Sequence, residues 1–399
     1  MKKIAIAMLV TALLLLGTVA TAFAAEQVVS DMTFGGNAVQ LSLDQAVQIM
    51  QTKGRRAESA TLNKKADEAV AKGYDESADS ISKLLKKLDA MVDGNMITSI
   101  QADSLAEQNQ ATEVNQKIMK LRRDFAQGQI DANYRAEMNQ IRIDTVELYY
   151  GVLQAEENLR VAKENLANQK TISANTQKKY RAGAVARFDT YTAETAVMTA
   201  EKDVASAQTA LNSAKMNFNM LLGYDLMQQV NLTDKLELVG RPQGSLARFI
   251  EKAKANRNEI KAPVFAADIQ EILLNNLKYR YPENSATYLS QLNAYQQAKK
   301  MVTDAPIQIE MEVRIKYMQL ADKRREVEVA KIVLANAEEG YRLAGITFDV
   351  GMNTVADVQE AQIRVYRAGQ GLTKAITDYD LAVYDFTNAI GVGTTRIPL

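Results

Sequence analysis

The sequence predicts an all-α protein built from two long helical hairpins, and three observations support that fold class. An apolar ladder steps by four and three residues, the period of a left-handed coiled coil. A second ladder repeats it at a constant offset of 168 residues. Only five prolines interrupt a chain of 399 residues that has no tryptophan, which is typical of long helices. The two ladders are Ala193, Val197, Ala200, Val204, Ala207, Leu211, Ala214, Phe218 and Leu221, and Ala361, Val365, Ala368, Leu372, Ala375, Tyr379, Ala382, Phe386 and Ala389.

A duplicated long helix is the simplest source of this constant offset. Many rungs are alanine, and small side chains let helix backbones approach closely. The ladders therefore favour a sheath of tightly packed helices over a solid core of leucine and isoleucine.

The amino-terminal segment, residues 1–24, is expected to be a cleaved signal peptide. Lys2 and Lys3 precede an apolar run over 4–16, and Ala22-Phe23-Ala24 supplies small residues for signal peptidase. A retained anchor is the alternative, but the run is shorter than the roughly 20 residues that span a bilayer. We therefore expect an exported protein, located in the outer membrane or elsewhere in the periplasm and cell envelope, with a polar lead over 25–40.

The residue inventory excludes several function classes. The chain has neither cysteine nor histidine, so disulfides, thiolate or histidine metal sites and histidine-based catalysis are not expected. The 48 basic residues balance the 48 acidic ones, and there is no basic block that would attract nucleic acid. We expect no enzyme, no cofactor, no bound metal and no nucleic-acid partner.

The first half, residues 41–240, begins with a helix that Ser42 caps. Helical patterning then continues, with breaks near Gly73 and Gly94, to about residue 124. A long hairpin follows over 131–223. Its first helix ends at Gly183, which suits the left-handed position after a helix, and its returning helix stops at Gly223.

The second half, residues 241–399, repeats this plan. An extended connector over 236–239 leads to a helical start over 246–260. The second long hairpin, 307–391, turns near Gly351 and returns to Ile390. Between 149 and 223 the two halves align without a gap at the same offset, which indicates an internal repeat.

The hairpin tips carry related motifs. They are Tyr180-Arg181-Ala182-Gly183 followed by Asp189, and Phe348-Asp349-Val350-Gly351 followed by Asp357-Val358-Gln359-Glu360. An exported, twofold-repeated chain with these tips resembles the TolC-like outer-membrane efflux family over nearly its whole mature length.

The resemblance implies a homotrimer whose hairpins form a coiled-coil α-barrel. It also implies a periplasmic adaptor, or membrane fusion protein, and an inner-membrane pump as partners. The tips would face the adaptor, with Gly183, Gly351, Tyr180 and Arg181 as contact candidates.

In that family an acidic pair at the start of the last long helix forms the aperture, and Asp357 and Glu360 match it here. A ring of carboxylates would attract cations. Asp357 is also placed to complete a capping box with Thr354, whereas Glu360 is not needed for a cap. Asp189 has weaker capping support, since the capping position before it is alanine.

Two residues at the gate depart from the family pattern. Phe348 and Asn353 stand where the best-described lock has a tyrosine and an arginine, so a gate here would close through other contacts. Gly183 and Gly351 have helix termination as the simpler explanation, and Tyr149 and Tyr317 are expected to pack.

The strands of that family's β-barrel are the larger departure, because the corresponding stretches, 71–130 and 275–304, show no alternating pattern. The second stretch holds four tyrosines, which suit either an interfacial belt or packing: Tyr279, Tyr281, Tyr288 and Tyr295. A chain without these strands would meet the outer membrane itself or an outer-membrane partner.

Two functions follow from these observations. The first is a passive export duct that hands substrates from a pump and adaptor across the envelope. The alternative is an exported coiled-coil spacer or envelope tether that does not transport. An open lumen in the trimer would discriminate between them.

Overall fold

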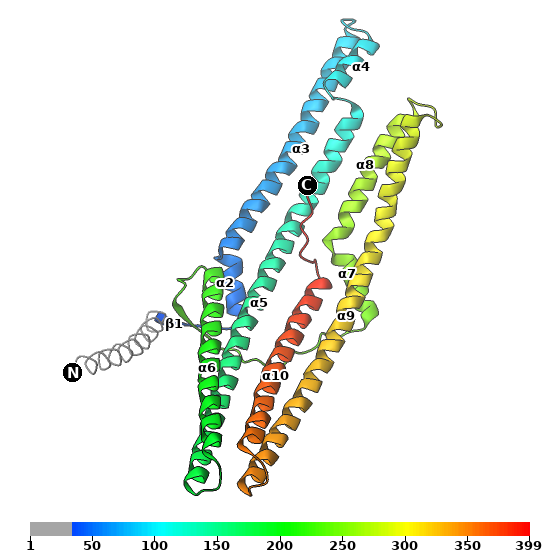
Figure 1. Cartoon of the computed structure of the whole chain (residues 1–399). Helices are drawn as coiled ribbons and strands as arrows, with labels where there is room; N and C mark the ends of the chain where they lie inside the picture. Colours follow the sequence, from blue (N-terminus) through cyan, green and yellow to red (C-terminus); the bar gives the residue numbers. More distant parts are fainter. Residues whose placement is uncertain (1–33) are drawn as a thin grey trace, which may run out of the picture.

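The computed structural model describes residues 34–399, which form an elongated helical molecule (Figure 1). The predicted signal peptide lies outside the described residues. The all-α fold class is confirmed, and the only strands in the described part of the chain form one short parallel pair.

The elements follow one another in an order that places two long helical hairpins at the lower end of Figure 1. The polar lead and the first half contain β1 (Gly35–Leu41), α2 (Leu43–Thr52), α3 (Arg55–Asp93), α4 (Ser99–Gln108), α5 (Glu113–Arg181), α6 (Arg187–Leu222) and β2 (Gln228–Leu232). The second half contains α7 (Leu246–Asn256), a 3₁₀ turn (Asn258–Ile260), α8 (Lys261–Lys278), α9 (Ala286–Asp349) and α10 (Val355–Ala389).

Four helices form the lower body, in the spatial order α6, α5, α10, α9 (Figure 1). The predicted ladders pack inside it. Leu211 and Phe218 of the first ladder are buried with Tyr149 of α5, and Tyr379 and Phe386 of the second are buried with α7 and α9. The predicted packing role of Tyr149 is therefore confirmed.

The upper body is also helical, because α5 and α9 start earlier than the sequence suggested. They begin at Glu113 and Ala286 rather than near 131 and 307. The upper part of α5 packs against α3, and the upper part of α9 packs against α8. The stretches that lacked an alternating pattern, 71–130 and 275–304, accordingly lie largely in helices.

The predicted break at Gly73 is wrong, because Gly73 lies inside α3. A glycine inside a helix costs about 1 kcal/mol relative to alanine. Packing offsets that cost, since Ala71 and Ala78 on either side are buried. Gly94, by contrast, does follow the end of α3.

A junction in the middle of the molecule joins segments that lie far apart in the sequence. The predicted polar lead contains β1, which pairs in parallel with β2. Asp234, two residues after β2, accepts hydrogen bonds from the Leu43 amide (2.8 Å) and the Tyr149 hydroxyl (2.7 Å). The chain after α10 turns upward along α5, where the Ile397 amide donates to Asn133 Oδ1 at 2.9 Å.

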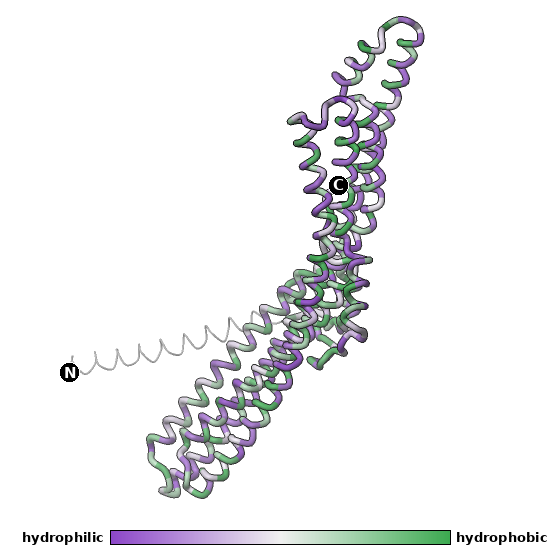
Figure 2. The backbone as a smooth tube through the Cα atoms, turned by 90° about the vertical axis from the view of Figure 1, so that its right-hand side faces the viewer, coloured by the Kyte–Doolittle hydropathy of each residue, from purple (hydrophilic) through white to green (hydrophobic). Residues whose placement is uncertain are grey.

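The rod is bent near its middle (Figure 2). Pro306 lies inside α9, three residues before Ile309, which packs against α7. A proline inside a helix removes one backbone hydrogen bond and clashes with the preceding turn. Pro306 therefore supplies one cause of bending in α9 close to the junction.

Among residues 34–399, none of the helices combines the length and the apolar character that a bilayer span requires.

Candidate functional site: hairpin tips and the α9–α10 groove

The first tip joins α5 to α6 through a short turn. Gly183 has φ of +71°, so it occupies the left-handed position that the sequence predicted. Asp189 Oδ2 accepts a hydrogen bond from the Ala186 amide at 2.9 Å. Because alanine has no side-chain acceptor, this is one half of a capping box. Tyr180 and Arg181 end α5 with exposed side chains.

The second tip joins α9 to α10 and is capped in both directions. Gly351 has φ of +77°. Asp357 Oδ2 accepts from the Thr354 amide at 2.8 Å, and Thr354 Oγ1 accepts from the Asp357 amide at 3.2 Å. The hydrogen bonds from the Thr354 side chain and backbone hold the pKa of Asp357 below its usual value. The predicted capping box is therefore present.

Glu360 lies one turn further along α10 and is exposed. Its Oε1 is 3.0 Å from Nη1 of Arg364 on the same helix face. Each candidate aperture acid thus has a partner within its own chain, Asp357 in the cap and Glu360 in an ion pair. Asn353 is half-buried in the turn before the cap.

The two tips are held together by Lys179, which the sequence analysis did not single out. Its Nζ donates to the Phe348 carbonyl, lies 3.5 Å from the centroid of the Phe348 ring and 3.5 Å from Asp349. A cation at the end of α9 interacts favourably with the helix dipole. The only sequence signal was the cluster of basic residues in the last turn of α5.

Phe348 itself points into a small core between the hairpins. It is buried with Ile172 and Ala193 of the first hairpin and with Val355 and Val358 of the second. Phe348 is thus a packing contact in this protein, and the basic group that restrains this tip, Lys179, comes from α5.

Buried amide side chains join α5 to α10 above the tips. Gln362 Nε2 donates to Asn165 Oδ1 at 3.3 Å, and Asn168 Nδ2 donates to Gln362 Oε1 at the same distance. Gln359 Nε2 lies 3.4 Å from the Thr192 carbonyl of α6. The two hairpins therefore meet through polar contacts at this level rather than through large apolar side chains.

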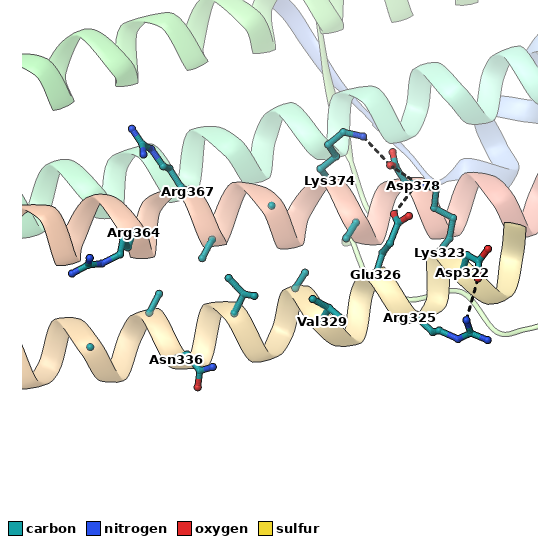
Figure 3. Close-up of a pocket in the computed structure, with 17 residues that line it drawn as sticks. Asp322, Lys323, Arg325, Glu326, Val329, Asn336, Arg364, Arg367, Lys374 and Asp378 are labelled. Carbon is teal, nitrogen blue, oxygen red and sulfur yellow. Dashed lines mark hydrogen bonds and ion pairs between the residues drawn. The ribbon is translucent and has the colours of Figure 1, made fainter.

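A long groove of about 1160 Å³ runs between α9 and α10 on the edge of the lower body (Figure 3). Short and apolar side chains line its middle: Val329, Ala330, Val333, Ala337 and Gly340 of α9, and Ala368, Gly371 and Ala375 of α10.

Charged residues lie toward both ends of this groove, with Arg364 and Arg367 toward one end and an ion-paired cluster at the other (Figure 3). Asp378 lies 2.8 Å from Lys374 and 3.3 Å from Lys323, which also pairs with Glu326 at 2.7 Å. The charges of this cluster are mutually paired, so the groove combines an apolar stretch with a neutralised end. This is the anatomy of an interface with a polar rim.

In residues 34–399, no three or more acidic side chains gather closely enough to hold a metal ion.

The fold has clear counterparts among solved structures. A structure of CusC, described in terms of folding and transmembrane channel formation, matches with a TM-score of 0.66 at 15% identity, covering 90% of this chain and 94% of that one. A membrane protein from Pseudomonas aeruginosa matches with a TM-score of 0.66 at 13% identity over 90% and 92%. The outer membrane protein VceC from Vibrio cholerae matches with a TM-score of 0.61 at 12% identity over 88% and 97%.

No protein-family model matches the sequence, and no curated protein matches it. The structural matches establish that the chain has the TolC-like fold found in outer-membrane channel proteins. At these identities the likeness shows the fold alone.

Proposed function

We propose that this protein is a TolC-like export duct, a homotrimer whose lower hairpins close into an α-helical tunnel. The tunnel receives substrates from an inner-membrane pump through a periplasmic adaptor and passes them across the envelope. It acts in the outer membrane or against an outer-membrane partner, and it carries out no chemistry. The fold of outer-membrane channels supports this class of function.

The observation that carries the proposal is the uncovered α9–α10 groove at one edge of the lower body. On α9, Val329 and Val333 are 59% and 50% exposed. With Asn336 and Gly340 they step by four, three and four residues, so they form one seam of a coiled coil.

The opposite edge of the lower body carries a second exposed seam. On α6, Met198, Lys202, Ala205 and Thr209 are exposed and step by the same intervals. Two different uncovered seams on opposite edges make a head-to-tail contact between copies, and such contacts form a ring when the rotation closes. We therefore assign the α9–α10 groove to α6 of the next copy.

The tips would form the mouth of this ring. Asp357 and Glu360 of each copy supply its carboxylates, Asp189 lies at the neighbouring tip, and Tyr180 and Arg181 are available to the adaptor. Because Glu360 is paired with Arg364 at 3.0 Å, the negative potential at the mouth depends mainly on Asp357.

Disulfide trapping tests the ring directly, because the chain has no cysteine of its own. We expect Ala205→Cys combined with Val333→Cys to give covalent trimers on mild oxidation. Each single variant, and Leu62→Cys combined with Val333→Cys, serves as a control that should stay uncrosslinked. A monomer under all these conditions would contradict the ring.

Imaging and conductance separate the duct from the spacer. Hollow trimers that conduct in planar bilayers, with weaker block by multivalent cations after Asp357→Asn and Glu360→Gln, are the expected result for a duct. Solid rods would favour an envelope spacer instead.

A further inference from the structure

A second groove lies within one protomer, between α6 and α10 and along α5. It consists of two adjoining hollows of about 450 and 600 Å³. Both are lined by Asp203, Tyr366 and Gln370, so they form one continuous channel, which we call the α5 groove. From Gln154 to Gln169 it follows α5 for about 20 Å at 1.5 Å per residue.

The floor of the α5 groove is a stripe of amides on one face of α5: Gln154, Asn158, Asn165 and Gln169. Among the described residues, Asn158 Oδ1 and Gln169 Oε1 are shielded from solvent and accept no hydrogen bond. A buried acceptor without a donor is unfavourable. Both side chains line the groove, so a rotation of either amide toward it would let its oxygen accept from a ligand that supplies hydrogen-bond donors.

The α6 wall also presents acceptors. The hydroxyls of Thr192, Thr195 and Thr199 each donate to the carbonyl one turn earlier, at 3.1, 2.9 and 3.0 Å. A hydroxyl whose proton is used in this way keeps its oxygen lone pairs for a ligand. The α6 wall and the α5 floor thus both offer hydrogen-bond acceptors and would pair with a ligand that carries donors.

The charge of the α5 groove is balanced. Among residues 34–399, Asp203 is the only acidic residue that lines it and Arg367 the only basic one. A polycation would find only the carboxylate of Asp203 to pair with and would be repelled by the guanidinium of Arg367. A polyanion would be repelled by the acceptor oxygens of the floor. A purely apolar ligand would leave the two buried oxygens unpaired. The groove is therefore suited to an uncharged ligand rich in hydroxyl groups.

Aromatic side chains stand at the tip end of the same groove. Phe188 and Tyr191 line it and are 75% and 51% exposed. The face of an aromatic ring is electronegative, so it attracts the weakly positive C–H bonds on the flat side of a sugar ring. Amides, hydroxyls and aromatic faces together match the alternating hydroxyl and C–H surfaces of a saccharide.

We propose that the α5 groove binds a linear, uncharged oligosaccharide, with hydroxyls donating to Asn158 and Gln169 and a terminal ring stacked on Phe188. The site lies within a single chain. It goes beyond the proposed duct and does not depend on the trimer.

Isothermal titration of the purified full-length protein with maltohexaose and with chitohexaose tests this site. We expect saturable binding of at least one, with one site per chain. Gln169→Met removes the buried acceptor at similar size and should weaken binding about fivefold, in line with the loss of one hydrogen bond. Phe188→Ala should weaken it to a similar extent.

Met352→Ala is the matched control, because Met352 is an equally exposed apolar residue on the other tip and does not line the groove. It should leave binding unchanged. If circular dichroism shows that Gln169→Met is misfolded, Phe188→Ala still tests the site, because Phe188 is exposed and its replacement should not disturb folding. No binding of either saccharide, binding unaffected by Phe188→Ala, or tighter binding of spermine would each overturn the proposal. None of these results bears on trimer formation, which the cysteine pair tests separately.

Discussion

The junction and the hairpin tips both concentrate charged side chains, but they hold them in different surroundings. At the junction, Arg257 is 8% exposed and lies 2.6 Å from Glu259 and 2.9 Å from Glu312. At the second tip, Glu360 and Arg364 pair at 3.0 Å while both remain in solvent. Exposed pairs contribute little to stability, whereas a buried charge that loses its partner is costly.

The same contrast extends to the chain after α10. Arg396 pairs with the buried Asp67 of α3, and Asn133 Nδ2 donates to the Ile397 carbonyl at 2.9 Å. These contacts join the upper body, the lower body and the end of α10 through polar groups. The junction therefore fixes the architecture, and the tips are free to change charge as function requires.

The largest expected effect in this comparison is at Arg257. Arg257→Leu leaves Glu259 and Glu312 facing one another without their shared cation and removes the bond to the Ala389 carbonyl (3.2 Å). We expect unfolding free energy to fall by about 3 kcal/mol, measured by chemical denaturation. Arg364→Leu at the tip should cost less than about 0.5 kcal/mol. Equal losses of unfolding free energy in the two variants would contradict the difference between the buried junction and the exposed tip.

Two glycines with positive φ, one at the junction and one at a tip, provide a second comparison of the two regions. Gly393 has φ of +80°, and an added Cβ would lie 3.0 Å from Nε of Arg257. Gly183 has φ of +71° with nothing within 4 Å. Alanine at either position pays the left-handed strain of about 1 kcal/mol. Gly393→Ala must also displace Arg257, so its loss should reach about 2 kcal/mol by thermal denaturation, while Gly183→Ala should stay near 1 kcal/mol.

Two aspartates should respond to pH with opposite signs. Burial raises the pKa of Asp380, whose Oδ1 accepts from the Val239 amide at 2.8 Å, to about 6. The folded state then binds a proton that the unfolded state releases at lower pH, so this group's contribution to stability falls as pH rises from about 4 to 7. The pKa of Asp357 is lowered by its cap, so its contribution is lost as pH falls through that lowered value.

Denaturation from pH 4 to pH 8 compares the two aspartates. Asp380→Asn should remove about 2.5 kcal/mol of the pH-dependent change across this range, since asparagine does not titrate. Asp357→Asn should leave the profile above pH 5 unchanged. A wild-type profile that matches Asp380→Asn throughout would show that Asp380 is ionised as readily as an exposed aspartate.

Periodicity was enough to predict the lower body. The four-and-three ladders identified the packed faces of α6 and α10, and Gly183 and Gly351 marked both turns, because positive φ favours glycine. The Thr354 and Asp357 cap followed from local spacing. These features depend on residues close together in the chain.

Contacts between residues far apart in the sequence could not be predicted from periodicity and local spacing. Lys179 meets Phe348 only after both hairpins have folded and packed side by side. Local propensity predicts a break at Gly73 because it does not include the packing of α3 on α5. The α5 groove likewise needs three helices at once, and its amides carry no periodic apolar signal that would distinguish them from an exposed face.

The smallest expected effect lies at the contact between the tips. Lys179→Met keeps an apolar stem against the Phe348 ring and removes the cation that binds the Phe348 carbonyl and Asp349. Since Asp349 is largely exposed, the loss in global stability should be about 0.5 kcal/mol. The local effect should be larger, because the cation bonds directly to the last turn of α9. Amide hydrogen exchange should therefore quicken over 346–352 in Lys179→Met and stay unchanged in the exposed control Lys178→Met. Unchanged exchange in both variants would mean that the apolar cluster around Phe348 holds the tips together without the cation.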